Sequence, residues 1–381
     1  MIEKRLRIAY VSSSAPTNPH AWSGAHYYMF KALSKHCGHV VYLGPLPLYI
    51  HILDFILCTL SFILEKLINK TFLVPNNRFF CKLKGIYWTK KLSEGLFDLV
   101  FAPAAASDIA YMNTRLPIVY FSDATLALLK FYYPGFRTAL NISREGVDRD
   151  LIDRLAISKS SLLIFSSQWA ANSSINHYGA EKERVRVIPF GANIERVPPE
   201  KSPRREGLVC RLLFLGKDWE RKGGKIAFDT LLELEKRGLR AELVVCGCRP
   251  PPSLSHPYMK VLSWVENKED LLSTADFLFL PTRAECFGIV FCEAAAYGVP
   301  IISTNTGGVA EVVTNGKNGF LLDRSADAAD YAKIISDVWH NNRLYCNLQE
   351  NSRKTYSERL NWDSWGKSMR HAIDDVVKFP T

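Results

Sequence analysis

Short apolar runs alternate along the whole chain with longer stretches whose apolar residues recur at helical spacing. This rhythm is typical of βαβ units, which build parallel sheets covered by helices. The strands expected in the first half are Leu6–Ser12, Val40–Leu43, Leu99–Phe101, Ile118–Phe121, Leu162–Ser166 and Val185–Pro189. Those expected in the second half are Arg211–Leu215, Ala241–Cys246, Val261–Ser263, Phe277–Leu280, Pro300–Ser303 and Gly319–Leu322. The sequence therefore predicts an α/β protein with two doubly wound, Rossmann-like domains.

A polar segment, residues 190–207, separates the two halves. It holds three prolines and seven charged residues, which is the composition of a linker. We expect a first domain over residues 1–190, a second over 208–355, and a terminal segment over 356–381. Two such domains joined by one linker leave a cleft, and ligands of these sheets sit at the carboxyl ends of the strands.

Residues 46–64 stand apart because they are almost continuously apolar. Their length approaches that of a membrane span, but His51 and Asp54 lie inside the stretch and argue against one. The apolar residues surround the helix and form no single stripe, so two interpretations stay open. The segment is either buried in the core or docked on a bilayer surface beside several lysines.

The composition is that of a folded globular protein, with 48% hydrophobic and 23% charged residues. The nine cysteines lack the spacing of a disulfide framework or a metal site, and free thiols suit a reducing compartment. Met1 to Arg5 run directly into an apolar stretch without the pattern of a signal peptide. We therefore expect a cytoplasmic protein.

Positive charge is concentrated at the start of the chain. The net charge is +10, and residues 1–100 hold 12 Lys and Arg against 5 Asp and Glu. A basic surface attracts an anionic partner, such as a membrane surface, and membrane contact would make the protein peripheral at the inner face. A solvated face that keeps the protein in solution is the alternative. No nucleic-acid-binding signature is present, so we expect no nucleic acid as a partner.

The first chemically informative stretch connects a predicted strand to a helix that begins near residue 225. Lys217 opens a polar loop that ends in Arg221, Lys222 and two glycines. Helix N-termini bind anions through unpaired N–H groups, and adjacent basic side chains add charge where a diphosphate would lie. Solvated cations would give the same local pattern, so this loop indicates a phosphate site only together with other motifs.

The second stretch, residues 281–294, is more specific. Glu285 falls in a loop at the carboxyl end of a predicted strand, and Gly288 opens the next helix. Glu293 lies within that helix among small apolar residues, where a carboxylate needs a partner. The backbone N–H groups offered to a phosphate are those of Gly288, Ile289 and Val290. We interpret the stretch as a ligand site; the alternative is that the glutamates only bridge neighbouring backbone.

Glu285 and Glu293, with seven residues between them, resemble the E-x7-E signature of retaining glycosyltransferase family 4. The resemblance extends over nearly all of residues 210–323. In the first half it is thinner, and the stretches that carry it are Trp22–Gly24, Ser122–Thr125, Ser166–Trp169 and Ile188–Asn193. It implies the GT-B fold of the group 1 glycosyltransferases, in which two Rossmann-like domains face each other across a cleft. It also implies that the terminal segment packs back towards the first domain, whether to couple the domains or merely to pack.

The resemblance further implies roles for individual residues. Arg221 and Lys222 would hold the donor diphosphate, Glu285 would contact hydroxyls of the donor sugar, and Glu293 would bind the nucleotide ribose. The other donor-binding residues that it implies are Gly24, Lys217, Gly247, Gly288, Ile289 and Val290. For Gly24 an ordinary turn is the alternative.

Two departures from the family pattern affect the expected site. Lys217 stands where the family often has arginine, so the charge is kept but the bidentate fork is lost. Many members carry a histidine near the reacting sugar, at a position where this chain has Asp123 at the end of a strand. Asp123 is our candidate catalytic residue in that corner, and an N-cap on the following helix is the alternative.

The reaction implied is transfer of a sugar, with retention, from a UDP- or GDP-linked donor to a glycan or lipid-linked acceptor in polysaccharide or glycolipid biosynthesis. Basic side chains and N–H dipoles would stabilise the leaving diphosphate, so we expect no metal and no other cofactor. The family's mechanism lets the leaving phosphate take the acceptor's proton. The alternatives are a sugar-nucleotide epimerase of the same fold and a non-catalytic scaffold that binds sugar nucleotides.

Overall fold

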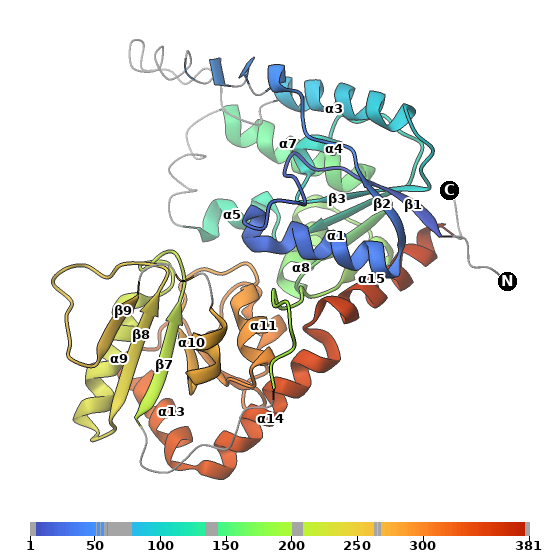
Figure 1. The fold of residues 1–381 in the computed structure, drawn as a ribbon. Helices are drawn as coiled ribbons and strands as arrows, with labels where there is room; N and C mark the ends of the chain where they lie inside the picture. The colour runs from blue at the N-terminus through green and yellow to red at the C-terminus, as the bar shows by residue number, and fades with distance from the viewer. Residues whose placement is uncertain are drawn as a thin grey trace. The chain divides into compact units, whose positions relative to one another are not determined.

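Every predicted strand forms in the computed structural model, within one or two residues of the expected bounds (Figure 1). The structure describes residues 5–50, 52–53, 55–56, 59, 78–133, 144–199, 209–262, 265 and 268–377, with residue 131 and residues 144–148 described by their backbone alone. The chain divides into two compact units. The first comprises Met1–Ile188 with Trp365–Thr381, and the second comprises Pro189–Ser364.

The first unit is built on a parallel sheet in the order β2-β1-β3-β4-β5-β6. Its strands are β1 (Leu6–Tyr10), β2 (Gly38–Tyr42), β3 (Leu99–Pro103), β4 (Ile118–Ser122), β5 (Leu162–Phe165) and β6 (Val185–Val187). All residues of β3 and β4 are buried, as expected for strands covered on both faces. Helix α1 (Ala25–His36) covers one face, and α3 (Arg78–Ser93) and α4 (Ala106–Ile109) cover the other (Figure 1).

The terminal helix α15 (Trp362–Val377) contributes its later part to the same unit. The Trp365 ring meets the rings of Phe101 on β3 and Phe121 on β4, with centroids 6.3 and 5.8 Å away. Gly366 packs against α1 so closely that a Cβ would lie 2.4 Å from the His36 ring. Residues after Trp365 therefore complete the cover of the first sheet on the α1 face.

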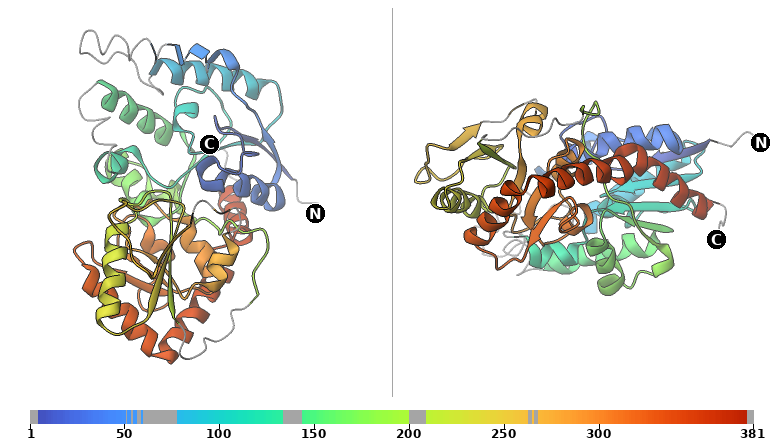
Figure 2. Two further views of the ribbon diagram at one scale, coloured as in Figure 1. Left: turned by 60° about the vertical axis from the view of Figure 1, so that its left-hand side comes forward. Right: turned by 90° about the horizontal axis from the view of Figure 1, so that it is seen from below.

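The second unit is built on a parallel sheet in the order β12-β11-β10-β7-β8-β9. Its strands are β7 (Cys210–Leu215), β8 (Ala241–Cys246), β9 (Met259–Leu262), β10 (Phe277–Leu280), β11 (Ile301–Thr304) and β12 (Gly319–Leu322). The order reverses between β7 and β10, which is the topological switch point where doubly wound sheets bind ligands. The helices are α9 (Gly224–Lys236), α10 (Glu269–Thr274), α11 (Ile289–Ala296), α12 (Val309–Val312), α13 (Ala328–His340) and α14 (Asn342–Arg359). Figure 2 shows this unit and the first from two further sides.

The start of the apolar segment 46–64 is buried on one side and exposed on the other, so the interpretation as core is confirmed only for part of it. Leu46 and Ile50 are buried in one cluster with Trp88 and Leu92 of α3. Leu48, two residues after Leu46, is 71% exposed. The remainder of residues 57–64, apart from Thr59, lies outside the described residues. Among the helices that the structure describes, none has the length and apolarity to span a membrane.

Helix α5 (Leu126–Tyr132) begins three residues after Asp123 and receives its caps from other helices. The Leu126 N–H donates to Asp153 Oδ2 at 2.7 Å, and the Ala127 N–H donates to the Tyr178 hydroxyl at 3.0 Å. Asp153 belongs to α7 (Arg144–Lys159) and Tyr178 to α8 (Gln168–Tyr178). The N-cap position itself is Thr125, so the interpretation of Asp123 as the N-cap is wrong.

The surroundings of Asp153 make stability depend on pH. Burial raises the pKa of Asp153 to about 6, with a smaller rise from the Asp150 charge, against the Leu126 N–H and Lys130, which lower it. Since the folded-state pKa lies above the unfolded one, the folded state binds more protons between about pH 4 and pH 6. The stability that protonated Asp153 contributes is therefore lost as the pH rises through that range.

We expect the free energy of unfolding of the wild type to fall relative to that of Asp153→Asn between pH 4 and pH 7, by on the order of 2 kcal/mol. The asparagine oxygen still accepts from the Leu126 N–H but does not titrate. Urea titrations of both proteins across this range, with Asp375→Asn as an exposed control, measure the difference. A wild type that gains on the variant as the pH rises would contradict the assignment.

Candidate functional site

Two loops at the carboxyl edge of the second sheet are joined by backbone contacts. One follows β7 and ends at Gly223, and the other follows β10 from Pro281. The Arg283 N–H donates to the Arg221 carbonyl at 2.7 Å, and the Thr282 hydroxyl donates to the same carbonyl at 3.2 Å. Gly223 has φ +76°, and a Cβ there would lie 2.0 Å from the Pro281 carbonyl oxygen. Only glycine permits this approach, which places the basic loop against the acidic one.

Lys222, Arg221 and Glu285 meet where these loops touch. The Lys222 ammonium donates to Glu285 Oε2, and both residues are less than a tenth exposed. Arg221 Nη1 lies 3.7 Å from the same oxygen and donates to the Ala284 carbonyl at 2.9 Å. A buried carboxylate is tolerated because cations compensate it. Arg221 Nε also lies 3.5 Å from Asp218 Oδ2, so two cations and two carboxylates meet here.

Helix α11 begins beside this cluster. Its N-cap is Gly288 with φ +87°, where a Cβ would lie 2.5 Å from the Phe291 ring. Ile289 and Val290 form the first turn and are half-buried. The first N–H groups of a helix have no partner within it, and the helix dipole favours negative charge there. The structure thus brings the predicted Gly288, Ile289 and Val290 together as one candidate anion-binding turn.

Glu293 lies on α11, one turn further on, and is 4% exposed. The Lys268 ammonium, immediately before α10, donates to Glu293 Oε1. Burial raises the pKa of Glu293, whereas Lys268 and the backbone N–H of Asn193 lower it. Two groups therefore fix this carboxylate in place. Both escaped the sequence interpretation: Lys268 belongs to no motif, and Asn193 was noted only as part of a resembling stretch.

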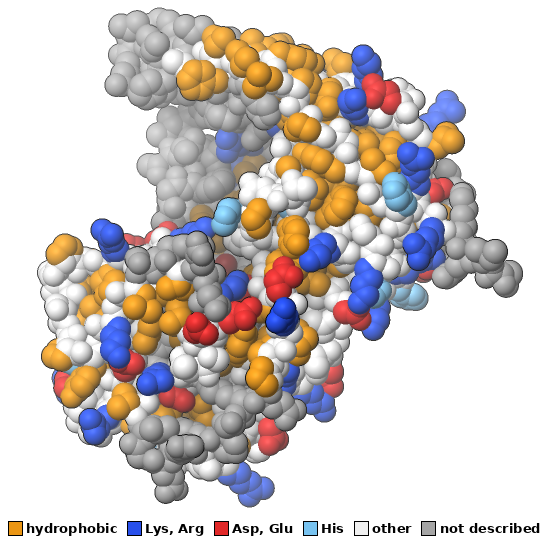
Figure 3. All heavy atoms as spheres, in the orientation of Figure 1, with side chains coloured by type: hydrophobic (Ala, Val, Ile, Leu, Met, Phe, Trp, Pro, Cys, Tyr) orange, Lys and Arg blue, Asp and Glu red, His pale blue; other side chains and the backbone are white. Residues whose placement is uncertain are grey.

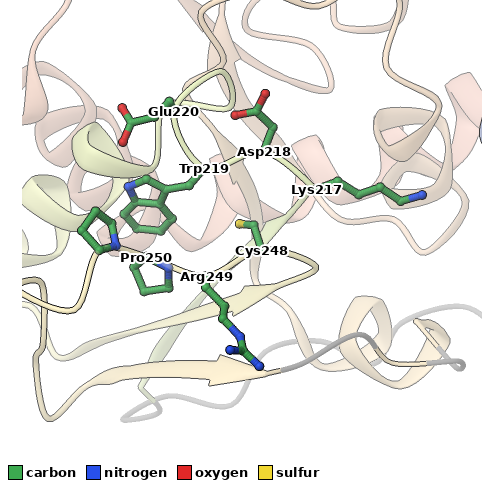
Figure 4. Close-up of a pocket in the computed structure, with 8 residues that line it drawn as sticks. Lys217, Asp218, Trp219, Glu220, Cys248, Arg249 and Pro250 are labelled. Atoms are coloured by element: carbon green, nitrogen blue, oxygen red, sulfur yellow. The ribbon is translucent and has the colours of Figure 1, made fainter. Parts of the chain in front are cut away.

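Gly247 and Lys217 lie at the neighbouring strand ends. The Gly216 N–H donates to the Cys246 carbonyl at 2.9 Å, and Gly247, with φ +90°, would place a Cβ 2.9 Å from the Gly216 carbonyl oxygen. Lys217 is exposed and lines an open cavity of about 510 Å³. The rest of its lining is Asp218, Trp219, Glu220, Cys248, Arg249, Pro250 and Pro251. In Figure 4 the Trp219 ring lies towards the prolines, while Lys217 and Arg249 extend away from it. Of the predicted residues, only Lys217 lines this cavity.

The predicted residues of the first unit meet at the carboxyl edge of its own sheet. Trp22, Ser23 and Gly24 follow one another with φ of 49°, 54° and 88°, a left-handed run that is strained for the two non-glycine residues. The Trp22 indole N–H donates to Asp123 Oδ2 at 3.3 Å. Asp123 follows β4 and Gly24 follows β1, so a side chain of the strained loop connects these strand ends. Sequence reasoning missed Trp22 as the connecting residue.

His26 supports this loop from behind. It is buried, and its Nδ1 lies 2.8 Å from the Tyr10 hydroxyl, while its ring centroid lies 5.5 Å from that of Trp22. Burial lowers the pKa of His26 to about 4, so the ring is neutral at neutral pH. His20 is exposed. Of the two histidines near the first loop, His26 is thus a packing residue behind Trp22.

Comparison with known families decides what the second unit is. Residues 210–341 match the family model described as glycosyl transferases group 1. These residues form a group 1 glycosyltransferase domain. The match includes both loops, Lys268 and the whole of α11, so the resemblance to the group 1 enzymes is confirmed for the unit that carries the buried carboxylates.

Relatives of the group 1 domain extend the likeness over more of the chain. A D-inositol 3-phosphate glycosyltransferase of Corynebacterium jeikeium is 24% identical over 261 residues, which are 61% of this chain and 62% of that protein. The chain thus spans less than two thirds of the length of that relative. A glycosyltransferase of Rickettsia africae has a TM-score of 0.66 at 13% identity, over 98% of this chain and 99% of its own.

A third similar protein is Anabaena Alr3699/HepE, solved in complex with UDP and glucose. Its TM-score is 0.65 at 17% identity, over 97% of this chain and all of that one. Likeness at this identity concerns the fold, and together with the two parallel sheets it shows that this chain has the GT-B fold.

Lys268 gives the site a testable dependence. Lys268→Met removes the cation from buried Glu293 and should lower the free energy of unfolding by about 1–3 kcal/mol. The double variant Lys268→Met/Glu293→Gln should recover part of that loss, because no unpaired charge then remains buried. Urea unfolding of the single and double variants measures the coupling.

Lys236→Met is the matched control, since Lys236 pairs with Glu233 but is 69% exposed. It should change stability by less than about 0.5 kcal/mol. Equal effects of Lys268→Met and Lys236→Met would show that the Lys268 pair is no more important than a surface pair.

Proposed function

We propose that this protein transfers a sugar, with retention, from a nucleotide-diphosphate donor to a glycan or lipid-linked acceptor. The observation that carries the proposal is the edge of the group 1 domain, where two buried carboxylates, Glu285 and Glu293, are each compensated by a lysine. They flank the first turn of α11 at the switch point of the sheet. Cations for phosphate and carboxylates for hydroxyl groups thus lie side by side.

In this proposal the donor lies with its ribose at Glu293, its diphosphate at the α11 N-terminus and its sugar at Glu285. Besides Lys268 and the Asn193 N–H, the Glu293 carboxylate can accept further hydrogen bonds, and a ribose diol is a suitable donor of them. Lys222 and Arg221 would share their charge between Glu285 and the diphosphate, whose other oxygens would accept from the N–H groups at Ile289 and Val290. Glu285 would then accept hydrogen bonds from hydroxyls of the donor sugar.

Breaking the anomeric bond places negative charge on the leaving diphosphate. Lys222, Arg221 and the α11 N-terminus lie together at this edge, so they would need little reorganisation as the charge develops. We propose that transfer needs no metal and no cofactor and that the leaving phosphate accepts the proton of the acceptor hydroxyl. An Asp-x-Asp sequence does occur, at residues 148–150, but it lies in α7 of the first unit, and Asp150 there accepts from the Tyr178 hydroxyl.

Asp123 is our candidate in the first unit for orienting the acceptor hydroxyl or stabilising positive charge on the sugar ring. Its carboxylate is fixed by Trp22 in a strained loop, and strain of this kind concentrates at functional sites. Gly24 in the same loop would let the backbone approach the diphosphate.

UDP is the first nucleotide to test, because HepE was solved with UDP and with UDP-glucose. A role in polysaccharide or glycolipid synthesis follows from a lipid-linked or glycan acceptor.

Donor binding is tested by thermal unfolding with UDP, GDP and ADP. At a ligand concentration of about 100 times the dissociation constant, the matching nucleotide should stabilise the protein by about 2.7 kcal/mol. Glu293→Ala should abolish the shift, and Glu350→Ala, an exposed control in the same domain, should keep it. If no nucleotide shifts the unfolding midpoint of the wild type, the proposed donor site is wrong.

Catalysis is tested by release of UDP from UDP-glucose in the presence of a membrane-lipid extract, with and without EDTA. Lys222→Ala should lower the rate on the order of 10²-fold, as expected when one group that stabilises the leaving charge is lost. Lys225→Ala removes a nearby exposed lysine and should leave the rate unchanged.

The same assay separates the alternatives. An epimerase would convert the donor without releasing nucleotide, and a scaffold would bind UDP without consuming the donor. Near-normal turnover by Lys222→Ala, with its unfolding midpoint preserved, would contradict the role of this lysine.

A further inference from the structure

The first unit exposes a concentrated apolar surface away from its sheet. Most of the large hydrophobic side chains that are exposed among the described residues belong to residues 48–56 and to α3. They are Leu48, Tyr49, Ile52, Phe55, Ile56, Phe79 and Ile86. Figure 3 shows hydrophobic side chains gathered over α3 along the upper edge of the view. We refer to these seven residues, together with Arg78, Lys82 and Lys90, as the α3 surface.

The elements that carry the α3 surface are packed against each other on their inner sides. Leu46 and Ile50, on the inner side of the same segment, are buried with Trp88 and Leu92, on the inner side of α3. The Tyr87 hydroxyl donates to the Pro45 carbonyl at 3.0 Å and joins the two elements further. The exposed apolar residues are therefore the outer side of packed elements, and each of these elements is apolar on two sides.

Among the residues described on this surface, the charged ones are all basic. Helix α3 contains five basic residues and no acidic one: Arg78, Lys82, Lys84, Lys90 and Lys91. Arg78, Lys82, Ile86 and Lys90 follow at intervals of four, so they lie along one side of the helix, and all four are exposed. Lys91 is paired with Glu94, whereas Lys82 lies over the Tyr111 ring at 5.7 Å. The outward stripe thus consists of three cations and one apolar side chain, Ile86.

We propose that the α3 surface docks this protein onto an anionic lipid bilayer. Aromatic and aliphatic side chains flanked by lysine and arginine fit the boundary between acyl chains and anionic headgroups, where the cations reach the phosphates. A second copy of the chain fits less well, because self-complementary pairing would bring the cations of both copies into one interface without an acidic residue of α3 to pair with them. The protein would lie on the membrane by these residues without spanning it.

The proposal goes beyond the transfer reaction and does not depend on it. It concerns residues of the first unit alone, whereas donor binding concerns the group 1 domain. Docking would bring the protein to the surface where lipid-linked acceptors are found, which would raise their local concentration. The two proposals fail separately, since a protein that binds UDP without binding vesicles, or the reverse, is directly observable.

The test is sedimentation with vesicles of phosphatidylglycerol and phosphatidylcholine in equal parts, compared with phosphatidylcholine alone, at low and high salt. The wild type should bind the anionic vesicles more tightly than the neutral ones, and its binding to the anionic vesicles should weaken as the salt concentration rises. Lys82→Gln/Lys90→Gln should reduce partitioning about 25-fold, at about fivefold for each cation lost. Leu48→Gln/Ile86→Gln should reduce partitioning to both kinds of vesicle.

Matched controls change the same residue types on the second unit. Lys317→Gln/Lys333→Gln and Val197→Gln/Val261→Gln replace exposed residues there and should bind vesicles as the wild type does. All variants change exposed side chains, and an unaltered thermal unfolding midpoint without ligand verifies that each is folded. Absence of wild-type binding, or equal losses in the controls, would overturn the proposal. So would a wild-type dimer that Leu48→Gln/Ile86→Gln converts to monomer without any vesicle binding.

Discussion

The group 1 domain depends on neutralising two carboxylates that its fold places out of water. Glu285 and Glu293 are each less than a tenth exposed, and an uncompensated charge at either position would oppose folding. Lys222 and Arg221 compensate the charge of Glu285, and Lys268 compensates that of Glu293. Gly223 is required because only its missing Cβ lets the basic loop reach the Pro281 carbonyl. In the function that we propose, the same cations that permit burial of the carboxylates would also bind the diphosphate, so stability and ligand binding would share one set of contacts.

At the carboxyl edge of the first sheet, the loop after β1 is held in place by hydrogen bonds and ring contacts. The first unit has no comparable cluster of paired charges in the loop after β1, and uses a strained backbone held by hydrogen bonds. Trp22 and Ser23 adopt left-handed conformations that cost free energy, and the loop is retained because Trp22 bonds Asp123 and rests on His26. His26 in turn is held neutral by burial against Tyr10. The unfolded chain binds a proton at this histidine from about pH 6.5, whereas the folded ring stays neutral to about pH 4. Stability is therefore lost as the pH falls through that range, in the opposite direction to the effect at Asp153.

Features that leave a local pattern in the sequence could be predicted, and contacts between distant residues without such a pattern could not. Strands such as β8 and β10 were predicted with their exact bounds because continuous apolar runs between polar loops have few other solutions. The partnership of Lys222 with Glu285 was foreseeable as a shared site, since both are marked by glycines at helix starts. Lys268 was not, because a lysine in a charged run before a short helix carries no local signal; only the tertiary fold brings it to α11. The caps of α5 were missed for the same reason, since Asp153 and Tyr178 reach it from helices later in the chain.

The apolar segment near residue 46 shows why hydropathy alone could not choose between core and membrane. A helix that packs on one side and meets lipid on the other is apolar all round, and so is a helix buried on all sides. The distinction lies in the partner elements: Trp88 and Leu92 cover Leu46 and Ile50, while no described core residue covers Leu48. The basic stripe on α3 is the observation on which our proposal of an anionic bilayer rests. A buried or self-associating face would place those like charges close together, whereas an anionic bilayer would attract them. Much of the excess of lysine and arginine in the first hundred residues lies on α3, the helix that borders the exposed apolar residues.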